Sequence, residues 1–380
     1  MSTAAQPAAT SEPRPLFTTI VVSTPVVLTV IATFILGRSS SEMTQAQYQR
    51  AVASQNQSKV ANQWSFFQAK RIRGTAYEVT GDLLLAQQTR EFTRDTLAEV
   101  ADDVVALIGA TAKSPPDPKL ASALQDLLQK AEQSRDRLRA ALSPPADGWK
   151  GKNATLKPDA VKAAFDALES YPETKTNGAG VTIDPDQLRL LNEVLDDIRK
   201  FRPEDEIAPK TLGITDETLL KAREKAKTNA AKVNERGRSI ERVLEEFDVL
   251  VAEQTRIVRE FQRWLETQIA AQPKGKDTTE LRERLSQLGR DLQHLQVDYK
   301  AARYSFAARR YEDDARSNQE AAYLYDVEVL KSSARSDRHL GRSFGFMIAM
   351  LVAQAGVTVG SLALALRFKL PAWLLAVLAG

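Results

Sequence analysis

Two uncharged apolar segments lie close to the two ends of the chain. Residues 16–36 and residues 344–366 contain no charged side chain. Each is long enough to cross the hydrocarbon core of a bilayer, which needs about 20 helical residues. The sequence therefore predicts transmembrane helices at 16–36 and 344–366, with a disordered N-terminus at 1–15. A third apolar segment, 370–380, has about 11 residues and would reach about halfway across, as a partial or truncated span.

The first apolar segment has an alternative interpretation as a secretory signal. Its apolar length exceeds the usual range of about 7 to 15 residues, and no small-x-small cleavage site follows it. Only Arg14 carries a positive charge ahead of it. We favour an uncleaved transmembrane helix.

The body between the spans, residues 38–342, is dominated by helical periodicity. Apolar residues recur at alternating steps of four and three, which is typical of helices that pack along a narrow seam. One helix is expected from about Ser41 to the prolines at 115 and 116, with a seam that includes Ile72, Val79 and Leu83. Another is expected at 117–142.

Two longer helical segments follow in the second half of the body. The first begins near Asp216 and ends near Gln272, and its apolar residues form a seam: Val233, Ile240, Leu244, Phe247, Val251, Val258, Phe261 and Leu265. The last runs from about 279 without a proline into the second span. Since a short turn joins them, they should be antiparallel. The fold class is all-α: transmembrane helices flanking an elongated antiparallel coiled-coil or helical-bundle body.

Residues 143–215 form an irregular insert within this body. Prolines and glycines punctuate it, and two shorter helices are expected near 158–170 and 185–201. The segment 180–184 is the single candidate strand.

Basic residues close to the second span predict the topology. Lys331, Arg335, Arg338 and Arg342 precede this span, whereas Arg367 and Lys369 follow it. The positive-inside rule places the side with more Lys and Arg in the cytoplasm, so the body is predicted to be cytoplasmic. The reverse topology, with a periplasmic body, is the alternative. The four residues share one helix face, which indicates either contact with lipid headgroups or an ordinary stop-transfer flank.

Charge and composition exclude some classes of function. The chain has 52 Lys and Arg against 49 Asp and Glu, and its net charge is +3. This balance lacks the basic footprint of a nucleic-acid binder. Cysteine is absent, which excludes disulfides and thiolate chemistry.

The residues that most often carry chemistry do not form a site. The chain has two histidines, His294 and His339, and zinc needs three or four protein ligands. We expect His339 to meet headgroups or water. We predict no catalytic, cofactor-binding or metal-binding residues, and a protein that is not an enzyme.

The second span carries a face of small residues. They repeat at steps of four and three, and two of them form a GxxxG motif: Ala349, Ala353, Gly356, Gly360 and Ala363. Such a face allows two helix backbones to approach closely. Its partner is either the first span or the same face in a second copy, and chance occurrence is an alternative.

Residues 54–84 resemble a known family. The resemblance is carried by SQNQSKVANQWSFFQAKRIRGTAYEVTGDLL, above all by Asn62, Trp64, Phe67, Gln68, Lys70 and Tyr77. The segment resembles an uncharacterised bacterial membrane-protein family, the domain of unknown function 4337. The resemblance implies one span, a charged helical body and closing apolar segments. The aromatic residues of this stretch either pack against the returning helix, near Tyr323 and Tyr325, or form a docking patch for a partner.

These observations favour a protein of the bacterial cytoplasmic (inner) membrane with a cytoplasmic helical stalk. Its expected partners are membrane lipid, a second copy of the chain and an unidentified protein. The leading hypothesis is a scaffold or interaction module. A signalling subunit that transmits helix displacement is the alternative, and a periplasmic export adaptor would require the reverse topology.

Overall fold

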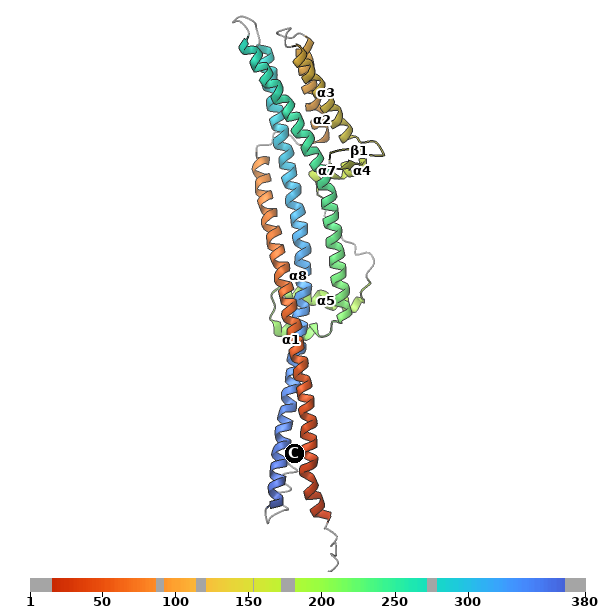
Figure 1. Ribbon diagram of the computed structural model, residues 1–380, viewed down its shortest axis with the longest axis vertical. Coiled ribbons are helices and arrows are strands. Elements are labelled where there is room, and N and C mark those ends of the chain that lie inside the picture. The colour runs from red at the N-terminus through yellow and green to blue at the C-terminus, as the bar shows by residue number, and fades with distance from the viewer. Residues whose placement is uncertain are drawn as a thin grey trace, which may run out of the picture. The chain divides into compact units, whose positions relative to one another are not determined.

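The structure is a computed structural model that describes residues 16–86, 92–113, 121–152, 154–171, 182–271 and 279–365. Within these ranges the chain forms eight α-helices and one two-stranded hairpin (Figure 1). The predicted all-α class, with long apolar helices flanking a helical body, is confirmed. The predictions for 1–15 and 370–380 fall outside these residues. The chain divides into unit 1 (Met1–Val60, Ile183–Leu220, Tyr323–Gly380) and unit 2 (Ala61–Thr182, Lys221–Ala322), which are described separately.

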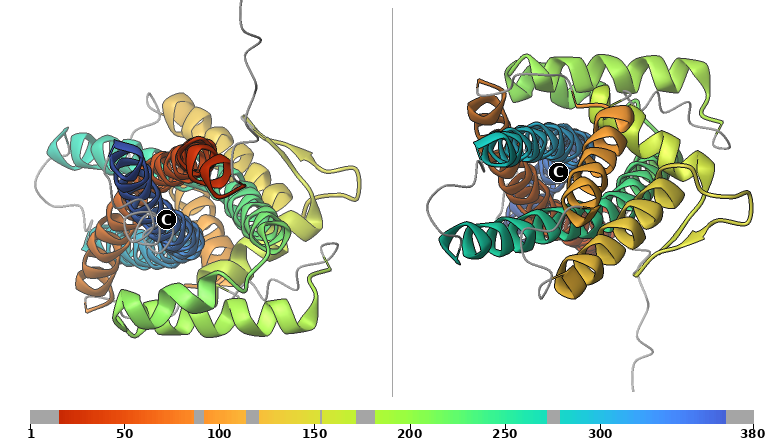
Figure 2. Two further views of the ribbon diagram at one scale, coloured as in Figure 1. Left: turned by 90° about the horizontal axis from the view of Figure 1, so that it is seen from below. Right: turned by 90° about the horizontal axis from the view of Figure 1, so that it is seen from above.

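Two very long helices contain the predicted spans. Helix α1 (Leu16–Leu85) and helix α8 (Thr279–Ala365) each continue from an apolar end into the charged body without a break. In unit 1 they lie side by side and antiparallel (Figures 1 and 2). Pro25 is accommodated inside α1, and the Thr29 hydroxyl donates to its carbonyl at 2.7 Å. Both helices are long and apolar enough to cross a membrane.

The contact between α1 and α8 in unit 1 is made by small side chains. Ser39 Oγ donates to the Ser343 carbonyl at 3.0 Å, and Ser343 Oγ donates back to the Ser39 carbonyl at 3.0 Å. Seven residues later in α1 and seven residues earlier in α8, Ser336 Oγ donates to the Ala46 carbonyl at 3.0 Å. Ala46 and Ala53 are buried at the same spacing. Because these side chains are short, the two backbones approach closely enough for hydroxyl-to-carbonyl bonds across the contact.

Two short helices complete unit 1. Helix α5 (Pro185–Arg199) begins at Asp184, whose carboxylate accepts from two backbone N–H groups, with proline at the first helical position. Helix α6 (Glu204–Thr211) follows. The α5 helix lies across α8, where the Arg199 guanidinium is 5.4 Å from the centre of the Tyr323 ring (Figures 1 and 2). Helix α7 (Asp216–Ala271) starts in unit 1 and continues into unit 2.

Unit 2 has an apolar core between α7, α8 and the helices α2 (Arg94–Lys113) and α3 (Ala121–Leu142). The predicted seam of α7 is confirmed, because all of its residues are buried: Val233, Ile240, Leu244, Phe247, Val251, Val258, Phe261 and Leu265. Phe247, Phe261 and Phe306 are fully buried. Each such side chain stabilises the fold by about 1.5–3 kcal/mol.

A small hairpin and one helix close the side of this core. Strands β1 (Trp149–Lys150) and β2 (Thr155–Leu156) precede helix α4 (Pro158–Glu169), whose Phe165 ring meets Phe247 edge-on at 5.0 Å. The buried carboxylate of Glu246 on α7 accepts from the backbone N–H groups of Lys152 and Ala154, at 2.8 and 2.9 Å. These two bonds fix the hairpin loop to α7.

In unit 2, α1 packs against α8 through glycines. A Cβ on Gly74 would lie 3.4 Å from the Ala308 carbonyl, and one on Gly81 would lie 3.5 Å from the Tyr304 Cβ. Between these two glycines, the Tyr77 ring stacks on Tyr304 and Tyr311, with centroids 5.7 and 5.5 Å away. The glycines thus bring α1 close enough for this aromatic contact.

The prediction for the first body helix was wrong in two respects. The chain has two helices there, because α1 ends at Leu85 and α2 begins at Arg94. The α1 seam was also misplaced: Ile72, Val79 and Leu83 are 70, 53 and 65 % exposed. The physical reason is that α1 meets α8 through glycines, which a search for apolar side chains passes over.

In the insert, α4 and α5 agree with the predicted helices, whereas α6 and the hairpin were not predicted. The candidate strand at 180–184 lies partly outside the described residues, and Thr182–Asp184 is not a strand.

The close approach of α1 and α8 predicts opposite effects for two substitutions at Gly81. Gly81→Ala should stabilise the fold by about 0.5–1 kcal/mol, because its Cβ makes an ordinary contact and alanine favours the helix. Gly81→Leu should destabilise it by about 1–3 kcal/mol, because the added atoms must enter between two backbones. Thermal unfolding followed by far-UV circular dichroism, in lipid nanodiscs, measures both.

Gly37 provides the control for this comparison. A Cβ on Gly37 meets no described heavy atom within 4 Å, so Gly37→Leu should leave the unfolding temperature unchanged or raise it. Equal stability of Gly81→Leu and Gly81→Ala would show that the helices are not in close contact at this position.

Candidate functional site

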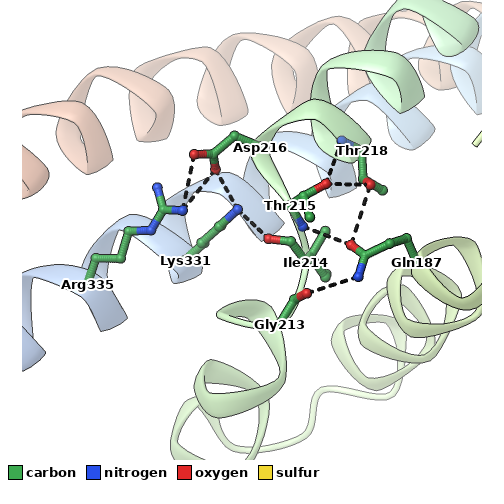
Figure 3. Close-up of polar contacts among 8 residues, drawn as sticks. All are labelled: Gln187, Gly213, Ile214, Thr215, Asp216, Thr218, Lys331 and Arg335. Atoms are coloured by element: carbon green, nitrogen blue, oxygen red, sulfur yellow. Dashed lines mark hydrogen bonds and ion pairs between the residues drawn. The ribbon is translucent and has the colours of Figure 1, made fainter. Parts of the chain in front are cut away.

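Polar residues from three separate parts of unit 1 meet where α7 begins (Figure 3). Lys331 of α8 donates to the Ile214 carbonyl and to the carboxylate of Asp216, the first residue of α7. Arg335, one turn further along α8, donates to the same carboxylate at 3.1 Å. We call Ile214, Asp216, Lys331 and Arg335 the Asp216 cluster. It ties the start of α7 to α8.

The chain before α7 is held by Gln187 in the first turn of α5. The Gln187 amide donates to the Gly213 carbonyl at 3.2 Å, and its oxygen accepts from the Thr215 N–H at 2.8 Å (Figure 3). Thr215 in turn caps α7, because its hydroxyl oxygen accepts from the Thr218 N–H at 3.1 Å. Asp216 lies next in the chain, where the positive end of the helix dipole favours a carboxylate. Local capping chemistry therefore places Asp216 opposite Lys331.

Lys331 is the unusual member of the cluster, because it is a charged side chain with only 2 % of its surface exposed. Burial lowers the pKa of Lys331 below its ordinary value, while the hydrogen bond to Asp216 acts in the opposite direction. A buried ammonium needs nearby acceptors, and Lys331 has the Ile214 carbonyl and the Asp216 carboxylate.

Asp216 responds to the same contacts. Partial burial alone would raise the pKa of its carboxyl group, but the hydrogen bonds from Lys331 and Arg335 outweigh this effect and hold the pKa below 3.8. The carboxylate is consequently ionised at neutral pH. This arrangement fixes helix ends relative to one another within unit 1.

Just beyond the cluster, α8 is bound to α1. His339 Nδ1 and Glu42 Oε2 are 2.6 Å apart, and Ser336 and Ser343 make the hydroxyl contacts described above. The prediction that His339 meets headgroups or water was therefore wrong, because Glu42 is its partner. Between Lys331 and Ser343, α8 contacts both the start of α7 and the flank of α1.

The four basic residues that precede the second span do not behave as one group. Lys331 and Arg335 bind Asp216, whereas Arg338 and Arg342 are exposed. Lys331 is therefore engaged within the chain, which argues against headgroup contact, one of the two alternatives, for this residue. The spacing in the sequence gives one indication of this burial, because Lys331 lies four residues after Val327 and therefore on the same helix face. Val327 is fully buried in the structure.

The small-residue face of the second span is largely buried within the single chain. Ala353 is 1 % exposed, and Gly356 and Gly360 are buried. Among the described side chains of the first span, Leu28 and Ala32 are buried. Ala349 is exposed, whereas Phe346 and Met350 nearby on the helix are half-buried. The Ala363 side chain lies outside the described residues.

The residues that carried the family resemblance have different environments in the structure. Lys70 forms an ion pair with Asp314 at 2.8 Å and lies over the Tyr311 ring, close to the stacked Tyr77. Trp64 meets Phe67 edge-on at 5.4 Å, while Asn62 and Gln68 are exposed. In unit 1, the Lys59 ammonium nitrogen lies over the Tyr325 ring, 5.6 Å from the ring centre.

Unit 2 contains a second polar network, between α7 and α8. Arg303 binds both Asp248 and Glu241, with nitrogen-to-oxygen distances of 3.0 and 3.1 Å. The Tyr299 hydroxyl donates to Asp248 at 2.6 Å, and burial raises the pKa of Tyr299 well above its ordinary value. Sequence analysis did not predict this network, because Arg303 and its acidic partners are 55 and 62 residues apart in the sequence.

No group of three or more His, Cys, Asp or Glu side chains within the described ranges has the arrangement of a metal site.

The first third of the chain can be compared with known proteins. Residues 19–144 match the family described as Domain of unknown function (DUF4337). The matched segment includes α2, α3 and nearly all of α1, with the residues that carried the resemblance, which is confirmed over this range. No significant match was found among curated proteins or among solved structures.

The buried ammonium of Lys331 predicts a strong effect of removing its partner. Asp216→Asn preserves the shape of the side chain but leaves the charge of Lys331 without its counterion. We expect a loss of about 1–3 kcal/mol in stability at neutral pH. Because the pKa of Asp216 is lowered in the folded state, its contribution is present above pH 3.8 and is lost as the pH falls through the lower folded value. Wild type and variant should therefore converge in stability as the pH falls below 3.8 and through this lower folded value.

Arg335→Gln is the matched control for Asp216→Asn. It removes the more exposed of the two cations that bind Asp216 and should cost less than about 1 kcal/mol. Thermal unfolding of all three proteins across this pH range gives the comparison. A constant difference between wild type and Asp216→Asn at every pH would refute the role assigned to the ion pair.

Proposed function

We propose that this chain is a membrane-anchored helical scaffold. Its spans form a hairpin in the bilayer, and its body presents helix faces to other proteins, including a second copy of itself. The observation that carries the proposal is an apolar stripe on α1, within the residues matched by the family, that the described residues leave exposed.

Three features support insertion of α1 and α8 in a bilayer. Their apolar ends have large exposed side chains such as Val26, Phe34 and Leu351, which water would solvate poorly. The hydroxyls of Thr24, Thr29 and Thr33 donate to carbonyls within α1, so these polar groups are satisfied inside the helix. Close packing of Ala353, Gly356 and Gly360 suits a contact between two spans.

The stripe on α1 has the spacing of a helix-to-helix seam. Ile72, Ala76, Val79 and Leu83 follow one another at steps of four, three and four, and all are exposed. Gly74 and Gly81, which contact α8, lie on the opposite side of the helix. One side of α1 thus contacts α8, and the other side is apolar and, among the residues that the structure describes, exposed.

A second copy of the chain is the partner that fits this stripe. Two copies anchored by the same spans hold their α1 helices parallel, and a two-fold axis brings identical faces together. Asn62 lies two heptads before Ala76 on the stripe and is exposed. A single polar residue at such a position specifies register and oligomeric state in helix pairs.

A signalling role is the second candidate. It is favoured by the continuity of α1 and α8, each of which runs from apolar segment to body as one helix. Displacement of either helix in the body would be carried directly into its apolar end.

Because the native chain contains no cysteine, crosslinking tests self-association directly. Val79→Cys places a thiol in the stripe and should give a disulfide-linked dimer in membranes under mild oxidation. Glu78→Cys is exposed on the neighbouring position but points away from the stripe, so it should give little dimer. Non-reducing electrophoresis measures both, and Ile72→Asp added to Val79→Cys should abolish the product. Equal crosslinking at positions 78 and 79 would exclude a specific interface.

We also propose that the body is cytoplasmic, on the basis of the exposed Arg338 and Arg342 and the positive-inside rule. Asp205→Cys, exposed on α6, should react with a membrane-impermeant maleimide only after the inner membrane is permeabilised. Ser11→Cys, on the N-terminal side of the first span, should react without permeabilisation. The opposite labelling pattern would reverse the topology.

A further inference from the structure

A groove lies between α7 and α8 in unit 2, with Tyr77 of α1 at one end. Its volume is about 750 Å³. A further hollow of about 420 Å³ extends it towards Ser286, because Thr255, Arg259 and Gln296 line both. The groove therefore runs along several turns of both helices.

The groove continues past the point where α1 stops. A Cβ on Gly81 would lie 3.8 Å from the Ala301 carbonyl oxygen. Helix α1 ends one turn later, at Leu85. Residues of α8 from Gln296 back to Ser286 line the part beyond. Helix α1 thus covers α8 as far as Ala301 and lines the groove only at its near end, through Tyr77.

The acidic residues along the groove are paired with cations, whereas some of its basic residues have no ion-pair partner among the described residues. Its acidic residues are already engaged: Glu241 and Asp248 bind Arg303, and Glu260 lies 3.9 Å from Arg256 and 3.8 Å from Lys130. In contrast, the exposed cations Arg259, Arg263 and Lys300 have no ion-pair partner within the described ranges. The groove thus presents uncompensated positive charge on its rim.

The floor between these cations is made of small or uncharged groups. Ala252 and Thr255 of α7 leave room for side chains of an incoming helix, and Gln296 of α8 lies opposite. From Ala252 to Arg263 the floor extends for about 17 Å, which corresponds to about three helical turns.

We propose that this groove binds an acidic amphipathic helix of a partner protein. The apolar side of that helix lies on Ala252 and Thr255, and its Asp or Glu residues, one turn apart, meet Arg259, Arg263 and Lys300. This is recognition of a helix in a groove, with specificity supplied by charge complementarity. The proposal names a partner class for the scaffold but does not use the α1 stripe, so the two proposals can fail separately.

A pair of designed peptides tests the proposal with the full-length protein in nanodiscs. The probe is a fluorescent helical peptide with leucine along one side and glutamate on both flanks, and the matched peptide has lysine in place of glutamate. Fluorescence anisotropy should show saturable binding of the glutamate peptide that weakens as salt is added, because exposed charges are screened. Equal binding of both peptides, or no binding of the glutamate peptide, would overturn the proposal.

Charge reversals locate the site. The triple variant Arg259→Glu, Arg263→Glu and Lys300→Glu should weaken binding of the glutamate peptide at least about tenfold. The control, Lys232→Glu, Arg238→Glu and Arg242→Glu, reverses three exposed charges of α7 away from the groove and should bind as wild type does. Circular dichroism verifies that both variants are folded. Equal loss in both would show that the peptide follows net charge and not the groove, which also contradicts the proposal.

The identity of the occupant is tested by a photo-crosslinking amino acid in place of Ala252, in cells that make the full chain. A crosslinked peptide from another protein with an acidic helical stripe supports the proposal. A crosslink to a second copy of this chain or to lipid overturns it, as does a partner segment without acidic residues.

Discussion

The close antiparallel packing of α1 on α8 is the constraint on which the rest of the structure depends. In unit 1 it is made by alanines and by serines, and the serine hydroxyls donate to carbonyls of the opposite helix. In unit 2 it is made by glycines that lie against alanine and tyrosine residues of α8. Side chains this small add little hydrophobic area, so van der Waals contact between backbones and hydroxyl-to-carbonyl bonds must contribute instead. They also fix which residues stand opposite one another, because a shift would bring larger side chains between the helices.

This packing decides which side chains remain available for other roles. Once Ser336, His339 and Ser343 are turned towards α1, Lys331 and Arg335 point to the start of α7, where Asp216 is their counterion. In unit 2 the same packing turns Ile72, Val79 and Leu83 outward. The position of the polar cluster and the outward direction of the apolar stripe are thus consequences of one contact.

Much of the fold was predictable from local patterns, whereas the sites depended on partners distant in sequence. The seam of α7 was correct because Phe247, Phe261 and their neighbours are both apolar and buried, and α4 and α5 were bounded correctly by prolines. The seam of α1 was wrong because glycines contribute no hydrophobic signal. Lys331 and Asp216 are 115 residues apart, and neither residue alone indicates the pairing. The network around Arg303 was missed for the same reason, since a charged heptad flank gives no sign of whether it is buried.

The continuity of α1 and α8 restricts how chains of this design can change in length. A single inserted residue would turn everything beyond it by about 100° around the helix axis. Gly74, Gly81, Ala46 and Ser39 would then leave the contact, unless α8 gained a matching residue on the other side. Lengthening in whole heptads, made in both helices together, preserves every facing pair. Evolutionary insertions should therefore accumulate between residues 143 and 215, where a longer loop disturbs no helix register.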